Sequence, residues 1–230
     1  MKTVGIIGGL SPESTMLYYE GINNGVRARL GGSHNAHIII NSLDFGEFCK
    51  LKEQGDWEKI TLLLCAAAKS LQSAGADFIL LATNTMHKVA DQIEESVSIP
   101  FIHLADSTAR KIKESGVDCV GLLGTRYTME QDFYKSRLHQ HGLRVLIPNE
   151  EARKDIHNVI YDELCNGIIN PKSLDVYKDV ISEFENQGAQ GFILGCTEIT
   201  MLIKPEDVNL MGFDTTLIHI EDALKYMFED

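Results

Sequence analysis

The chain has few basic residues. Its 230 residues include 21 Lys and Arg against 33 Asp and Glu, which gives a formal net charge of −12. Proteins that bind nucleic acid through its phosphates need a concentration of positive charge. We therefore expect no nucleic-acid partner.

Long hydrophobic runs are also missing. The longest apolar stretch, residues 62–68, is far shorter than the roughly 20 residues that span a bilayer. The first residues do not show the charged-then-apolar pattern of a signal peptide. These observations predict a cytoplasmic protein without a membrane partner.

The five cysteines form no CxxC pair, so neither a disulfide framework nor a zinc knuckle is indicated. The sequence also lacks a Walker A loop, a GxSxG elbow and the GxGxxG spacing of a dinucleotide loop. No lysine stands at a predicted strand end, where it could carry pyridoxal phosphate. We expect no cofactor and no metal.

What the chain does have is a regular alternation of short β-branched runs and helical patterns. It predicts strands at residues 3–8, 37–42, 78–82, 101–104, 119–124, 144–147 and 191–195. It predicts helices at residues 12–29, 57–73, 86–95, 105–115, 128–141, 151–166, 173–187 and 217–228. Such alternation is typical of an α/β fold with mainly parallel sheets flanked by helices.

The second half of the sequence repeats the first. Residues 75–83 resemble residues 188–196 at an offset of 113, and residues 5–9 resemble residues 121–125 at an offset of 116. Chance similarity between buried strands is the alternative to duplication. We predict two pseudo-symmetric lobes, the first formed by residues 1–98 with 213–230 and the second by residues 99–212.

The repeat brings Thr83 and Cys196 to matching positions, each directly after a predicted strand. Ligands of open parallel sheets bind beyond the carboxyl ends of the strands. A reaction that inverts a stereocentre needs one group on each face of the carbon to move the proton. We expect Cys196 to gain a lowered thiol pKa from a following helix N-terminus, although a buried structural cysteine is the alternative.

Polar side chains surround both positions. Asn84 and Thr85 follow Thr83, and with Thr125 and Thr197 they could bind a carboxylate through hydroxyl, amide and backbone N–H groups. The alternative for these residues is ordinary helix capping. His87 fits a supporting role better than that of the base.

Four segments together resemble the aspartate/glutamate/hydantoin racemase superfamily, and its aspartate racemase branch most of all. They are GIIGGLSPEST from Gly5, TNTMH from Thr83, GLLGTRYTM from Gly121 and GCTEI from Gly195. The resemblance covers essentially the whole chain. It implies a cofactor-independent amino-acid racemase, with two α/β lobes, an active site in the cleft between them, and a homodimeric assembly.

In this family each lobe supplies one catalytic cysteine. By resemblance, Cys196 acts on the L isomer, whereas Thr83 stands where the other cysteine would be. Either the chain is a racemase of a Thr/Cys kind that works preferentially from the L isomer, or it exchanges the α-hydrogen without inversion. The expected substrate-binding residues are Ser11, Lys52, Asn84, Thr85, Thr125, Thr197 and Glu198.

The substrate that the resemblance favours is L-aspartate or L-glutamate. However, the segment Leu43-Asp44-Phe45-Gly46 lacks the family's arginine, and Cys165 stands in place of a lysine. Lys52 or Lys50 could replace that charge, although solvated surface lysine is the simpler role. Neutral substrates such as homoserine are the second choice. A non-catalytic amino-acid or small-carboxylate binder and a one-cysteine lyase or cis–trans isomerase are further alternatives.

Overall fold

The computed structural model describes residues 1–204 and 207–229. The chain forms two compact units, which we call the first unit (Met1–Leu104 with the residues from His219 onward) and the second unit (Ala105–Ile218).

The first unit contains a three-stranded parallel sheet in the order β2-β1-β3. Its strands are β1 (Val4–Gly8), β2 (Ile38–Ser42) and β3 (Phe78–Leu81). Its helices are α1 (Pro12–Leu30), α2 (Phe45–Gln54), α3 (Trp57–Ser73), the 3-10 helix η1 (Thr85–Val89), α4 (Ala90–Glu95) and most of α11 (Thr215–Phe228).

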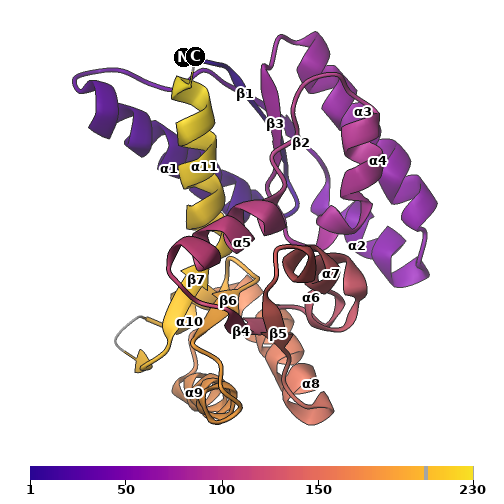
Figure 1. Ribbon diagram of the computed structural model, residues 1–230. Helices are drawn as coiled ribbons and strands as arrows, with labels where there is room; N and C mark the ends of the chain where they lie inside the picture. The colour runs from indigo at the N-terminus through magenta and orange to yellow at the C-terminus, as the bar shows by residue number, and fades with distance from the viewer. Residues whose placement is uncertain (205–206, 230) are drawn as a thin grey trace. The chain divides into compact units, whose positions relative to one another are not determined.

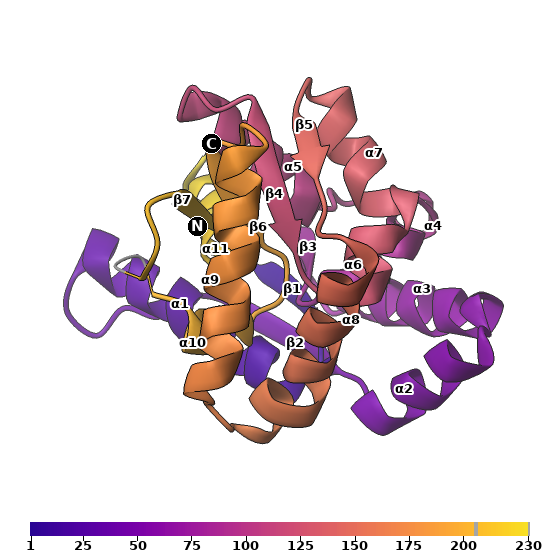
Figure 2. The same ribbon diagram turned by 90° about the horizontal axis from the view of Figure 1, so that it is seen from below.

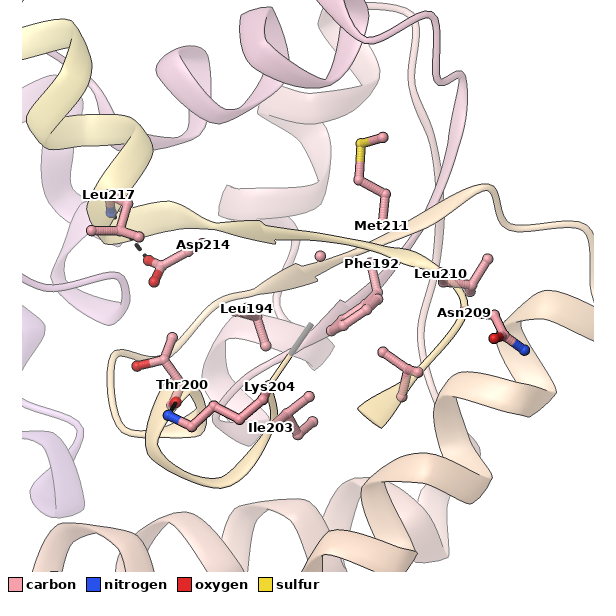
Figure 3. A pocket seen from close by; sticks show the side chains of 12 residues that line it. Phe192, Leu194, Thr200, Ile203, Lys204, Asn209, Leu210, Met211, Asp214 and Leu217 are labelled. Carbon is pink, nitrogen blue, oxygen red and sulfur yellow. Dashed lines mark hydrogen bonds between the residues drawn. The ribbon is translucent and has the colours of Figure 1, made fainter. Parts of the chain in front are cut away.

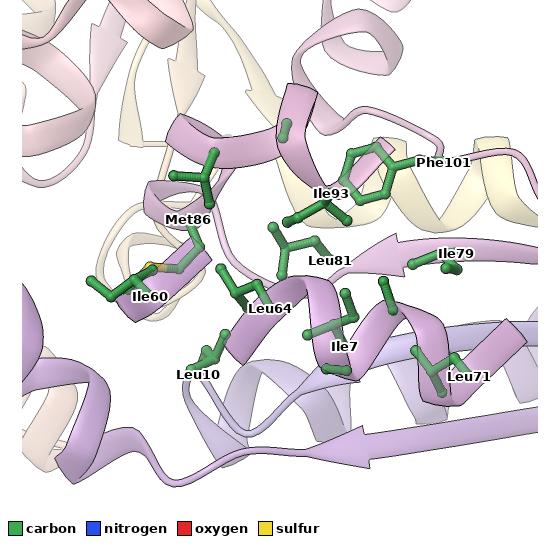
Figure 4. Packing of buried hydrophobic residues seen from close by; sticks show 14 of the residues in the cluster. Ile7, Leu10, Ile60, Leu64, Leu71, Ile79, Leu81, Met86, Ile93 and Phe101 are labelled. Carbon is green, nitrogen blue, oxygen red and sulfur yellow. The ribbon is translucent and has the colours of Figure 1, made fainter. Parts of the chain in front are cut away.

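β1 and β3 are buried on both faces, and because successive side chains of a strand point to opposite sides, each strand contributes to two clusters. Ile7, Ile79 and Leu81 pack against α2, α3 and α4 (Figure 4). Ile6 and Leu80 belong to a second cluster, with residues of α1 and α11. Figure 1 shows α1 and α11 on one side of the sheet and α3 and α4 on the other. Strands covered on both faces need continuous apolar runs, which explains the sequence pattern of β1 and β3.

The second unit contains a four-stranded parallel sheet in the order β5-β4-β6-β7. Its strands are β4 (Cys119–Leu123), β5 (Arg144–Leu146), β6 (Gly191–Leu194) and β7 (Met211–Asp214). Its helices are α5 (Leu104–Glu114), α6 (Arg126–Glu130), α7 (Asp132–Gln140), α8 (Glu150–Asn158), a π-helical turn η2 (Val159–Glu163), the 3-10 turn η3 (Leu164–Asn166), α9 (Pro171–Asn186) and α10 (Ile199–Leu202). In Figure 2, α8 and α9 lie in front of this sheet and α5 lies behind it.

Strands β5, β4 and β6 of the second sheet follow the order of β2, β1 and β3 in the first, and the pairing of β4 with β6 has the register of β1 with β3. In the first unit Val4 of β1 lies opposite Phe78 of β3. In the second unit Val120 of β4 lies opposite Gly191 of β6. The two pairs are separated by the same offsets of 116 and 113 residues that the sequence repeat shows. The turns before β3 and β6 also match, because Gly75 and Gly188 both have positive φ angles, of 95° and 88°. These agreements favour duplication over chance similarity.

Several sequence-based boundaries were wrong. Residues 101–104 do not form a strand, because Phe101 makes only an isolated bridge to Ile79 and α5 begins at Leu104. The predicted helices over residues 86–95, 128–141 and 151–166 are each divided into shorter helical segments. The helices α2 and α10 and the edge strand β7 were missed. Each missed element is short or polar, so it carries little periodic signal.

In the part of the chain that the structure describes, no helix combines the length and apolar character needed to cross a membrane.

The turn after β1 depends on glycine. Gly9 has a φ angle of 79°, and its N–H donates to Thr15 Oγ1 at 2.8 Å. A Cβ atom at position 9 would meet the backbone oxygen of Leu43. Position 9 therefore excludes larger side chains for both conformational and steric reasons.

We expect Gly9→Ala to destabilise the protein by about 3 kcal/mol, combining left-handed backbone strain with a backbone clash. The matched control is Gly32→Ala. Gly32 also has a positive φ angle, of 58°, but its added Cβ would meet nothing within 4 Å, so we expect about 1 kcal/mol. Urea denaturation measures both changes. Equal losses for the two variants would contradict the steric part of this explanation.

Candidate active site

Thr83 lies in a tight turn at the carboxyl end of β3. Its N–H donates to the carbonyl oxygen of Leu81 at 2.9 Å, a three-residue γ-turn pattern. Thr83 is partly exposed, whereas Asn84 and Thr85 are buried. Asn84 precedes η1 but makes no side-chain cap hydrogen bond. Simple helix capping therefore does not explain Asn84.

Cys196 follows β6 at the position that Thr83 has after β3. The preceding Gly195 donates its N–H to Leu123 O at 2.7 Å, and a Cβ there would lie 2.6 Å from that oxygen. Cys196 Sγ lies 2.8 Å from Glu198 Oε2, and Thr197 Oγ1 lies 2.8 Å from the same oxygen. One carboxylate oxygen thus accepts from both the thiol and the hydroxyl.

The electrostatics of Cys196 differ from the expectation drawn from sequence. Cys196 is partly exposed as a residue, but burial of its sulfur raises the pKa of the thiol well above the ordinary value, and the negative charge of Glu198 raises that pKa further. The prediction that a helix N-terminus lowers the pKa of Cys196 was wrong. The next helix, α10, begins only at Ile199 and has four residues, so its dipole is too short and too distant to offset burial. The resting state is therefore a thiol that donates to the Glu198 carboxylate.

Two neighbours of Cys196 were not assigned from the sequence. Cys165, in η3, and Tyr177, in α9, both interact electrostatically with Cys196. Burial raises the pKa of Tyr177 well above its ordinary value. Position 165 is the position that lacks the lysine expected by resemblance. Nothing in the local sequence distinguishes Tyr177 from a core aromatic.

The other candidates occupy separate local structures. Ser11 caps α1 by accepting from the N–H of Ser14. Thr125 is the N-cap of α6 at the carboxyl end of β4, and its Oγ1 accepts from the N–H of Thr128 at 3.4 Å. Lys52 lies in the last turn of α2. Capping is thus an observed role for Ser11 and Thr125, and Thr125 Oγ1 also lies 3.3 Å from Thr128 Oγ1.

The second unit also contains a cavity of about 660 Å³ beside the edge strand β7 (Figure 3). Phe192 and Leu194 of β6, with Met211 of β7, form part of its apolar lining. None of the described residues that line it is a predicted site residue. Within residues 1–204 and 207–229, no group of three or more His, Cys, Asp or Glu side chains is arranged to hold a metal ion.

Comparison with known proteins defines the family. The model of the Asp/Glu/hydantoin racemase family matches residues 7–223. The chain belongs to this family. A protein from Yersinia pestis assigned as an Asp/Glu racemase has a crystal structure that matches the racemase with a TM-score of 0.95, at 51% identity over all of both chains.

Two further relatives support this family assignment. The crystal structure of an aspartate racemase homologue from Pyrococcus horikoshii OT3 matches with a TM-score of 0.89, at 37% identity over all of both chains. The broad specificity amino-acid racemase RacX of Bacillus subtilis (strain 168) is 23% identical over 207 residues, 87% of each chain. The predictions of the superfamily, of its aspartate racemase branch and of an amino-acid racemase, an isomerase, are confirmed.

We expect Glu198→Gln to have opposite effects on thiol reactivity and on catalysis. Removing the negative charge lowers the pKa of Cys196, so alkylation of this thiol should reach its half-maximal rate at a lower pH. Racemase activity should fall about 100-fold or more, because the acceptor for the thiol proton is lost. Peptide mass spectrometry measures alkylation of Cys196 separately from the other cysteines. An unchanged pH midpoint would contradict the assigned electrostatics.

Proposed function

We propose that the racemase interconverts the L and D isomers of an acidic amino acid, aspartate or glutamate, without an organic cofactor. In this proposal Cys196 and Thr83 act on opposite faces of one Cα. The observation that carries it is the shared register of the two sheets, since it gives a thiol and an alcohol the same position after β6 and β3. A proton-transfer reaction with inversion needs such a pair.

The Cys196 side begins with proton transfer from the thiol to Glu198, whose carboxylate oxygen is 2.8 Å away. The resulting thiolate removes the α-proton of the L isomer and becomes a thiol again. The electrons of the C–H bond stay on the substrate as a carbanion delocalised into its carboxyl group. Glu198 later releases its proton to solvent. We thus extend the substrate-binding role expected for Glu198 to that of a general base.

The Thr83 side completes the inversion. The Thr83 hydroxyl delivers a proton to the opposite face of Cα and is reprotonated by water, so one proton enters and one leaves in each turnover. An alcohol is a much weaker acid than a thiol, so the deprotonated form of Thr83 is scarcely populated and Thr83 cannot serve as a resident base for the D isomer. This difference can affect rates only, because enantiomers in achiral water have equal free energy. Exchange at the Cys196 face without inversion is the alternative.

The substrate carboxylate needs hydrogen-bond donors. Buried Asn84 and Thr85 supply amide and hydroxyl groups beside Thr83, and Thr125 and Thr197 supply hydroxyls at the ends of β4 and β6. Their roles are part of the proposal, as are those of Ser11 and Lys52.

A broader or neutral specificity is the second candidate, and two observations favour it. Asp44 is the N-cap of α2, accepting from the N–H of Glu47 at 2.9 Å, so the segment after β2 carries negative charge where an arginine was expected. Position 165, an electrostatic neighbour of Cys196, is a cysteine instead of a lysine. The relative RacX is named for broad specificity. Acidic substrates nevertheless agree with the aspartate racemase branch.

The main test uses a panel of L-amino acids in deuterated water. We expect wild-type protein to introduce deuterium at Cα of L-aspartate or L-glutamate and to form the D isomer. Cys196→Ala should lower α-exchange at least about 100-fold, as NMR and chiral chromatography would show. Retained exchange in this variant would remove Cys196 from the mechanism. Binding without exchange by wild type would instead favour a non-catalytic binder.

Thr83→Cys tests the other face. A thiol at position 83 is a stronger acid than the hydroxyl, so its thiolate can remove the α-proton of the D isomer. We expect kcat for D-to-L conversion to rise about 10-fold or more, with Thr83→Ser as the matched control that keeps an alcohol. Equal D-isomer rates for the cysteine and serine variants would argue against a role for position 83.

A further inference from the structure

Two buried histidines of the first unit, His87 and His219, form hydrogen bonds to the segment that ends at Leu104. The chain leaves the first unit after Leu104 and returns to it at His219. His87 is 3% exposed and His219 is fully buried. Their ring centroids are 6.2 Å apart. Neither ring has a part in the proton transfers proposed above.

The hydrogen bonds of His87 fix its tautomer. The backbone N–H of Leu104 donates to His87 Nε2 at 3.3 Å, and a backbone N–H cannot accept. Nε2 therefore carries the lone pair, and the ring proton is on Nδ1. This Nδ1–H donates to the carbonyl oxygen of Thr83 at 2.7 Å. Protonating Nε2 would oppose the Leu104 N–H, so this arrangement requires a neutral ring.

The hydrogen bonds of His219 fix the opposite tautomer. Its Nε2 lies 2.8 Å from the carbonyl oxygen of Ile102, which can only accept, so Nε2 carries the proton. In the neutral ring Nδ1 then accepts from the hydroxyl of Tyr18 at 2.7 Å. Tyr18 is 1% exposed. Both rings thus hold the segment 102–104 through Nε2, which carries the proton in His219 and the lone pair in His87.

That segment has little regular structure of its own. Ile102 N–H donates to Ile79 O at 3.0 Å, which attaches the segment to β3. Beyond this bridge, His219 holds Ile102 and His87 holds Leu104. The same His87 ring holds Thr83 at its other nitrogen. His87 therefore links the backbone of the Thr83 turn to Leu104, the first residue of α5.

We propose that His87 is a positioning residue of the racemase: its neutral Nδ1–H ring fixes the Thr83 turn against the start of α5. The catalytic consequence rests on the proposed role of Thr83, whereas the geometry stands independently. Loss of the ring should free the Thr83 carbonyl and shift the hydroxyl that faces Cα. The effect should be on inversion more than on Cys196-dependent exchange.

The first experiment is independent of activity. NMR of protein containing 15N-labelled histidine, at neutral pH, should show His87 protonated at Nδ1 and His219 protonated at Nε2. In His87→Phe the amide of Leu104 should exchange with solvent up to about 10-fold faster, since it loses its acceptor. A charged His87, or a ring with the proton on Nε2, would overturn the proposal.

The second experiment is kinetic. His87→Asn places an amide donor near the position of Nδ1 and can keep the bond to Thr83, whereas His87→Phe removes both bonds. We expect His87→Phe to lower the ratio of inversion to α-exchange with retention about 10-fold, and His87→Asn to restore most of it. His219→Gln, which can keep the donation to Ile102, controls for destabilisation in the same cluster.

A purely structural role predicts a different result. In that case inversion and exchange would fall together in both His87 variants, in proportion to their urea stability, and the positioning role would be rejected. If wild-type protein shows no α-exchange at all, the proposed function fails, while the tautomer and amide-exchange measurements still decide the geometry of His87. If His87→Phe does not fold, the wild-type NMR spectrum and His87→Asn provide the test.

Discussion

The structure depends most on how β3 and β6 pair with the central strands β1 and β4. Parallel pairing in one register ends each strand at a fixed level, and the residue two positions beyond that end is Thr83 in the first unit and Cys196 in the second. Glycines let neighbouring residues pack closely on the central strands: a Cβ at Gly5 would lie 2.9 Å from Ala76 and 3.2 Å from Leu71 of α3, and a Cβ at Gly121 would meet the Phe184 ring of α9. Close packing of helix on strand therefore fixes the positions to which the chemistry is attached.

The side chains at the two positions, Thr83 and Cys196, differ in how readily they lose a proton. Burial favours the neutral thiol of Cys196, and the adjacent Glu198 carboxylate favours it further. Such a thiol is unreactive until its proton moves, and the acceptor lies 2.8 Å away. This arrangement keeps a nucleophilic thiolate from accumulating in the free protein, where it would be open to oxidation. A base generated only as the reaction begins is compatible with proton transfer at Cα.

The sequence predicted the α/β class, the parallel sheets and most strands, because buried parallel strands have short apolar runs bounded by glycine. It wrongly predicted a strand at residues 101–104, where only one isolated bridge to Ile79 forms and hydrogen bonds to His219 and His87 hold Ile102 and Leu104. The Cys196 pKa was predicted in the wrong direction because sequence shows a following helix but shows neither its four-residue length nor burial. Tyr177 was missed because its proximity to Cys196 comes from folding alone.

The hydrogen bonds of His87 and His219 bear on how the first unit would use the Thr83 hydroxyl in the proposed mechanism. A thiol can ionise, so its reactivity can be adjusted by a neighbouring charge, as Glu198 does for Cys196. A threonine hydroxyl does not ionise near neutral pH, so its ability to transfer a proton depends on where it is held. Two hydrogen bonds of neutral groups hold the Thr83 backbone: its N–H donates to Leu81 O, and its carbonyl oxygen accepts from the His87 ring. In the proposed mechanism the second unit thus controls Cys196 by charge, and we infer that the first unit controls Thr83 by position.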